Sequence, residues 1–161
     1  MGFDLIGKNL DESDQVDTAP NEGDVLTLSV AINQGGSMFS SLDEYLEEKG
    51  FPTNTARFSC SNRYWHTIWG FLKFANQNVH PKYRFIGTES DFKMGEENSG
   101  HFINEPMAGS IVICCQNGIK NNFFDKYMDE YSVSDDEKST CLDLTERFID
   151  FCNKSGGFYI L

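Results

Sequence analysis

Cysteine and histidine side chains are the first candidates for chemistry in this sequence. A thiolate beside an imidazole is a nucleophile used by many enzymes. Two such pairs are conceivable, Cys60 with His66 and Cys115 with His101. A catalytic cysteine needs an accessible, electropositive setting, but Cys115 falls on the apolar stripe of a predicted helix and His66 follows Trp65 on another. The pattern therefore favours buried thiols and a histidine at the edge of the core.

A group of carboxylates with one histidine, between residues 87 and 104, offers a metal site as a second possibility. Carboxylate and imidazole groups bind zinc and harder cations when a loop folds around the ion. The spacing here matches no recognised metal-binding loop, and solvated loop charge explains it better, so we expect no cofactor. The four residues are Asp91, Glu96, Glu97 and His101.

Local signatures of other reactions are missing from the sequence. It contains neither of the glycine-rich patterns that cradle phosphate groups, G-x-x-x-x-G-K-[ST] and G-x-G-x-x-G, nor the G-x-S-x-G turn of serine hydrolases. A glycosidase pair of carboxylates leaves no local pattern, so that reaction stays open. The lack of a catalytic motif favours a binding protein over an enzyme.

The charge of the chain is strongly acidic. The formal net charge of the 161 residues is −12, from 25 acidic and 13 basic side chains, and the first 50 residues carry 11 acidic and two basic side chains. Contacts with nucleic-acid phosphates need clustered Lys and Arg, so we expect no direct nucleic-acid binding. An acidic surface attracts basic partners. The residues predicted to bind such a partner are Asp11, Glu12, Asp14, Asp17, Asp43, Glu44, Glu47 and Glu48.

The cysteine pattern and the opening residues point to one compartment. The five cysteines form no C-x-x-C pair, and an odd number is typical of reduced thiols in a reducing cytosol. The sequence opens without the basic and apolar segments of a secretion signal, and no apolar run is long enough to cross a membrane. We therefore expect a cytoplasmic protein with no membrane partner.

Hydrophobic periodicity predicts the elements that must position these residues. In the first third, alternation of apolar and polar residues indicates strands, and a stretch with no apolar period indicates an exposed loop. A capping-box pattern, Ser41 with Glu44, starts a short helix. The predicted elements are a strand over 2–6, an acidic loop over 8–23, a strand over 24–32 and a helix over 41–50.

An aromatic helix over residues 62–76 is predicted to be the main core helix. Its apolar residues recur at intervals of three and four, as on the buried face of a helix. Trp65 and Trp69 lie one turn apart on this face. Two indoles so placed could form a ligand-stacking platform, but large rings at helical spacing are more often core.

The remainder of the chain predicts further helices around one long loop. Residues 87–104 are rich in Gly, Glu and Ser, which is typical of a loop. Helix signals follow, including a capping box formed by Thr140 and Asp143. The predicted elements are a brief strand over 83–86, the loop over 87–104, a helix over 105–127 that bends at Gly118, and a final helix preceded by a loop over 132–139.

The last residues of the chain predict a strand laid into a sheet. Residues 158–161 alternate at the period of a strand, and the Gly156-Gly157 pair separates them from the final helix. Strands near both ends with helices between them indicate a single α+β domain over 1–161. Its small, mainly antiparallel sheet comes from terminal and near-N-terminal strands, packed by three to four helices.

Three segments together resemble a family of small uncharacterised proteins from bacteriophages and bacterial genomes. The family typically opens with Met-Gly-x-Asp-Leu-x-Gly, carries a Trp-rich stretch and closes with an aromatic helix leading into Gly-Gly-Phe. The matching segments here are 1–7 (MGFDLIG), 64–69 (YWHTIW) and 148–158 (FIDFCNKSGGF). The resemblance implies a compact fold and a phage or mobile-element setting, and it carries over no catalytic residues.

Together these patterns predict a non-enzymatic, acidic interaction protein that modulates a host protein by docking on its basic surface. Two alternatives stay open. One is a small intracellular enzyme with its site near residues 87–104, and the other is a ligand-binding module built on the aromatic helix.

Overall fold

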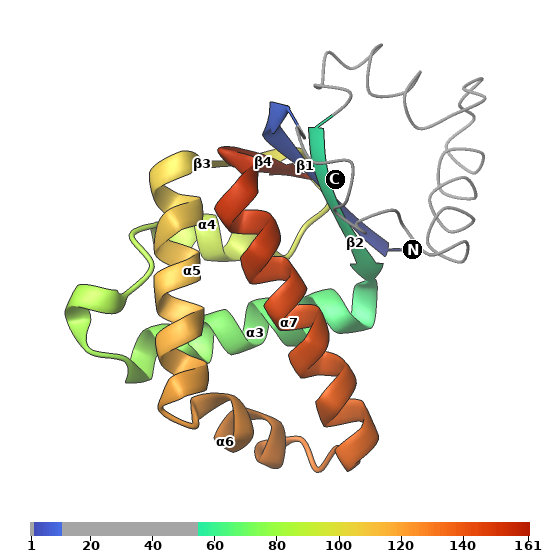
Figure 1. Ribbon diagram of the computed structural model, residues 1–161, viewed down its shortest axis with the longest axis vertical. Helices are drawn as coiled ribbons and strands as arrows, with labels where there is room; N and C mark the ends of the chain where they lie inside the picture. Colours follow the sequence, from blue (N-terminus) through green and yellow to red (C-terminus); the bar gives the residue numbers. More distant parts are fainter. Residues whose placement is uncertain (1, 11–54) are drawn as a thin grey trace.

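The computed structural model describes residues 2–10 and 55–161, which form a four-stranded antiparallel sheet with helices on one of its faces (Figure 1). The strand order is β2-β1-β4-β3. The predicted α+β class and antiparallel sheet are confirmed. The strands are β1 (Gly2–Leu10), β2 (Thr55–Ser61), β3 (His101–Asn104) and β4 (Gly157–Ile160). The helices are α3 (Asn62–Asn78), the 3-10 helix η1 (Pro81–Tyr83), α4 (Glu89–Met94), α5 (Glu105–Lys120), α6 (Phe123–Glu130) and α7 (Asp135–Ser155).

The carboxyl-terminal strand β4 lies inside the sheet, between β1 and β3. Tyr159 pairs with Ile6 on one side and with Phe102 on the other, so the predicted terminal strand is confirmed. Two glycines turn the chain from α7 into β4, Gly156 with φ 61° and Gly157 with φ 98°. A Cβ on Gly157 would come within 2.8 Å of a β3 carbonyl oxygen. Only glycine adopts both conformations without strain.

Helix α3 begins directly after β2, where the Ser61 hydroxyl accepts a hydrogen bond from the Tyr64 backbone N–H at 3.4 Å. Its apolar side chains repeat every three or four residues and pack against β1, β2 and the other long helices. The helix predicted over 62–76 is confirmed, with two more residues at its end. The buried side chains are Trp65, Ile68, Trp69, Phe71, Leu72 and Ala75.

Aromatic rings fill the space between the sheet and α7. The ring of Phe148 lies edge-on to Trp65 at a centroid distance of 5.4 Å and tilted against Phe58 at 5.6 Å. Phe151 and Phe158 meet edge-on at 5.2 Å. All five side chains are at most 1% exposed. Such pairs add about 0.5–1.5 kcal/mol each beyond the area that they bury, so they fix α7 against the sheet.

The segment predicted as a long loop over 87–104 contains two regular elements instead, α4 and β3. The loop prediction was wrong there for two reasons. Thr88 and Asp91 form a capping box that starts a helix of only six residues, too short to give a periodic pattern. Strand β3 exists through pairing with β4, some 55 residues later in the chain, which no local signal reports. The brief strand predicted over 83–86 is also absent from the described residues, where η1 and an extended turn lie.

The amino-terminal boundaries also differ from the prediction. Strand β1 continues through Leu10, four residues beyond the predicted end, because Leu10 pairs with Thr55 of β2 after a register shift that follows Ile6. Residues 8–10 therefore belong to a strand and not to the predicted acidic loop. The rest of that loop, the strand over 24–32 and the helix over 41–50 lie outside the described residues.

Helix boundaries in the second half shift for local reasons. The helix predicted over 105–127 is two helices, because the chain turns at Asn122 with a left-handed φ of 61° and not at Gly118. Helix α7 begins at Asp135, where the Ser134 hydroxyl accepts a hydrogen bond from the Glu137 N–H, nearly two turns before the predicted capping box. With α4, the described residues contain five α-helices, against the three to four predicted.

Candidate functional site

The residues predicted to bind a basic partner lie outside the described part of the chain. The candidate sites that follow are therefore drawn from residues 2–10 and 55–161 alone. The eight predicted residues are Asp11, Glu12, Asp14, Asp17, Asp43, Glu44, Glu47 and Glu48.

The five cysteines are thiols, and all of them are buried. Burial raises the pKa of Cys114 to about 11, and it holds the pKa of its neighbour Cys115 well above its usual range. A nucleophilic cysteine needs the opposite, a lowered pKa in an accessible place. Cys60 is only 3% exposed, whereas His66 lies on the exposed side of α3. The geometry gives no support to Cys60 with His66, or to Cys115 with His101, as a nucleophilic pair.

His101, on the outer strand β3, pairs with Asp91 on α4. Its Nε2 atom lies 3.0 Å from Oδ1 of Asp91, and the two side chains are 14% and 19% exposed. The second oxygen, Oδ2, accepts hydrogen bonds from the backbone N–H and the hydroxyl of Thr88, each at 2.7 Å. Burial acts to raise the pKa of Asp91, but the Thr88 and His101 hydrogen bonds outweigh it and hold that pKa below 3.8. An ionised carboxylate thus orients the imidazole.

The other two carboxylates of the metal site considered from the sequence do not join this pair. Glu96 forms a salt bridge with Lys73 of α3, and Glu97 is exposed. Within the described ranges no three His, Cys, Asp or Glu side chains come together as metal ligands. The sequence placed Asp91 and His101 in one cluster, and the structure joins these two of the four.

Replacing Asp91 by Asn should lower stability by on the order of 1 kcal/mol. A hydrogen bond to a charged group is worth about 1.5–3 kcal/mol, and the 19% exposure of Asp91 reduces that value. Because the folded-state pKa is lowered, the carboxylate stabilises the fold above about pH 3.9, and this contribution is lost as the pH falls through the folded pKa. Urea unfolding should therefore show a wild-type advantage near neutral pH that disappears in acid.

Glu89→Gln is the matched control for this variant, because Glu89 is an exposed carboxylate in the same turn of α4. Its effect should stay within about 0.5 kcal/mol. An Asp91→Asn protein as stable as the wild type at neutral pH would show that the pair is not a structural link.

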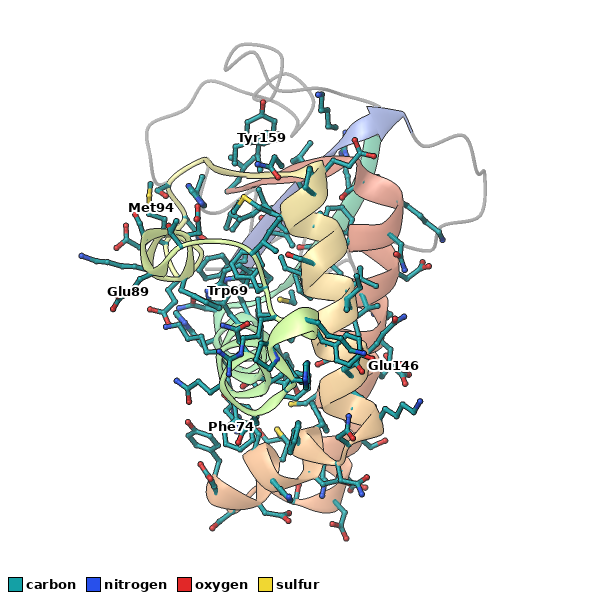
Figure 2. The ribbon with its side chains drawn as sticks, turned by 90° about the vertical axis from the view of Figure 1, so that its left-hand side faces the viewer. Trp69, Phe74, Glu89, Met94, Glu146 and Tyr159 are labelled. Carbon is teal, nitrogen blue, oxygen red and sulfur yellow. The ribbon has the colours of Figure 1, made fainter. Side chains whose placement is uncertain are left out.

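The two tryptophans hold α4 in place. The indole N–H of Trp65 donates to the Gly95 carbonyl at 2.7 Å, and that of Trp69 donates to the Phe92 carbonyl at 2.8 Å. Both side chains are 0% exposed, and their rings stack at a centroid distance of 5.2 Å. Figure 2 shows Trp69 inside the molecule, between α4 and the long helices. These indoles are core residues, as predicted, and their burial argues against a ligand platform on this helix.

A surface groove with a volume of about 400 Å³ runs between α5 and α7. Its floor is apolar, formed by Ile119 and by Ile149, which is 6% exposed. On the α5 side the groove is lined by a side-chain amide and an amine. On the α7 side it is lined by two carboxylates. Glu146 of that side lies beside α5 in Figure 2. The rim residues are Gln116 and Lys120 on α5, with Glu146, Asp150 and Asn153 on α7.

This groove was missed by reasoning from the sequence, although α5 carries one signal of it. Ile113 lies off the buried stripe of the helix and is 46% exposed. A single exposed apolar residue is common on protein surfaces, so this signal is weak by itself. The groove itself depends on the packing of α5 against α7, which the sequence does not reveal.

None of the helices within residues 2–10 and 55–161 has the length and apolar character needed to cross a bilayer. Comparisons with protein-family models, with curated proteins and with solved structures find no match to this chain.

Proposed function

We propose that this protein is a non-enzymatic interaction protein that binds a basic surface of another protein. The observation that carries the proposal is the charge of −12, of which −9 lies in the first 50 residues. A field of that sign raises the rate of encounter with cationic partners and repels nucleic acids. The resemblance to phage and bacterial proteins supports a host protein as the partner and the host cytoplasm as the place of action.

Neutralising the acidic segment tests this proposal. The variant carries Asp11→Asn, Glu12→Gln, Asp14→Asn and Asp17→Asn. The immobilised wild-type protein should capture basic proteins from a bacterial lysate, and capture should decline as the screening length falls from about 10 Å at 0.1 M salt to about 3 Å at 1 M. The variant should capture the same proteins more weakly. Equal capture by both proteins at every salt concentration would reduce the acidic segment to a solubilising surface.

A small intracellular enzyme with its site near residues 87–104 is the second candidate, because one observation favours it. A histidine hydrogen-bonded to an ionised carboxylate is oriented for proton transfer, as His101 is by Asp91 at 3.0 Å. The same carboxylate also caps α4 through Thr88, and that structural role accounts for its contacts. The binding function therefore has the stronger support.

A further inference from the structure

The two longest helices of the carboxyl-terminal half form a valley that is suited to a third helix. Helix α5 runs away from β3, and α7 runs back toward β4, so the two lie antiparallel and side by side (Figure 1). Their groove spans about one helical turn of α5, from Gln116 to Lys120, and about two turns of α7, from Glu146 to Asn153. A third helix laid along this valley would place its side chains on the isoleucine floor, as helices do in hydrophobic grooves.

The apolar surface extends beyond the groove along α5. Ile113 lies one turn before Gln116 and two turns before Lys120, so these residues share one face of the helix. It is 46% exposed. One further turn back, Gly109 has no atom of the described residues within 4 Å of the place where a Cβ would stand. This part of α5 therefore offers a low, partly apolar surface that another backbone can approach closely.

The charges on the two rims select the occupant. The α7 rim carries Glu146 and Asp150, both exposed, and the α5 rim carries Lys120. Asp150 also pairs with Lys154 at 2.7 Å, but an exposed pair of this kind is weak and exchanges readily with a partner's cation. A helix with Lys or Arg along the edge that faces α7 would satisfy both carboxylates. Lys120 on the α5 rim would repel those basic side chains if the bound helix lay with its basic edge toward α5.

The net charge disfavours the other occupants. A second copy of this chain would bring two charges of −12 together, and anionic membranes or nucleic acids would be repelled in the same way. We propose that the groove between α5 and α7 is the docking site for a cationic amphipathic helix of another protein, with apolar side chains on Ile119 and Ile149 and basic side chains toward Glu146 and Asp150. The proposal rests on the proposed function and assigns a second contact surface to it.

A synthetic amphipathic helix of leucine and lysine, about 18 residues long, is the probe for this site, and the same peptide with glutamate for lysine is its counterpart. Binding to the full chain is measured by fluorescence anisotropy. The groove variant is Glu146→Lys with Asp150→Lys. The matched control is Glu89→Lys with Glu97→Lys, which changes the charge equally at exposed positions around α4, away from Glu146 (Figure 2).

We expect the lysine peptide to bind the wild type and the glutamate peptide not to bind. The groove variant should weaken the affinity at least tenfold, and the control should change it less than threefold. Amide chemical shifts should move in residues 113–120 and 146–153. The groove proposal would be overturned if the two variants weakened the peptide affinity equally, or if the amide chemical shifts moved mainly in other residues.

The four-residue neutralisation of the acidic segment separates this proposal from the proposed function. If it abolishes peptide binding while the groove variant does not, the acidic segment is the contact surface and the groove is not. If the lysine peptide binds at none of the salt concentrations, the groove proposal fails. Lysate capture still decides the proposed function independently.

Discussion

Deleting Phe158 to Leu161 should unfold the protein or lower its melting temperature by about 10 °C or more. Phe158 and Ile160 are both 0% exposed, and burying each is worth about 1.5–3 kcal/mol. The deletion also removes the strand between β1 and β3, so β3 loses its pairing. A domain of this size loses roughly 2–4 °C per kcal/mol, and its whole stability is about 5–15 kcal/mol. Thermal unfolding followed by circular dichroism measures the change.

Two further proteins make the deletion interpretable. Asn153→Ala changes an exposed residue of α7 near the same end of the chain, and it should leave the melting temperature within about 2 °C. Ile160→Ala keeps the backbone of β4 and should cost about 2–5 kcal/mol by itself. A truncated chain that melts with the wild type would show that β4 adds nothing to the fold.

The sequence predicted those elements whose signals are local. The stripe of α3 and the glycine pair before β4 each combine a period with a stop or start residue. These signals suffice because the forces that set them act within a few residues. The fold class followed from the alternation of the terminal strand and from the helical stripes.

Elements created by distant pairing were missed. Strand β2 lies beside β1 through the register of Phe3 with Cys60 and Leu5 with Phe58, across a long stretch of chain. Strand β3 depends on β4 in the same way, and α4 depends on the indole N–H groups of α3. A local pattern does not record a partner more than 20 residues away, so α4 and β3 were predicted as loop and β2 was not predicted at all.

The same contrast between local signals and distant contacts applies to the candidate sites. Asp91 and His101 were recognised as one cluster because they lie ten residues apart, but they were expected to be solvated loop charge, whereas the structure makes them a link between α4 and β3. The groove was not recognised, because Ile119 and Ile149 meet only when α5 packs against α7. A site formed by helices that are distant in the sequence is recognised only from the tertiary structure.

Replacing Trp69 by Ala should destabilise the protein by about 3–5 kcal/mol, the usual cost of truncating a buried aromatic side chain. The ring is 0% exposed, and it packs edge-on to Phe85 and Phe92 at centroid distances of 6.5 and 6.3 Å. It also fills the space at Gly95, where a Cβ would lie 2.0 Å from the indole. Urea unfolding gives the change in free energy directly.

The same substitution should loosen α4 more than the rest of the fold, because Trp69 donates one of the two indole hydrogen bonds that anchor it. Hydrogen exchange should accelerate first in residues 88–97. Trp69→Phe keeps an aromatic ring but loses the N–H and part of the bicyclic indole, so it should recover only part of the stability. The lost hydrogen bond to the Phe92 carbonyl contributes about 1–3 kcal/mol of the remaining cost. Gln77→Ala, on the exposed side of α3, should change neither measurement. If Trp69→Ala left both the unfolding free energy and the exchange of α4 unchanged, the indole would not be the anchor, and the aromatic helix would again be a candidate surface for a ligand.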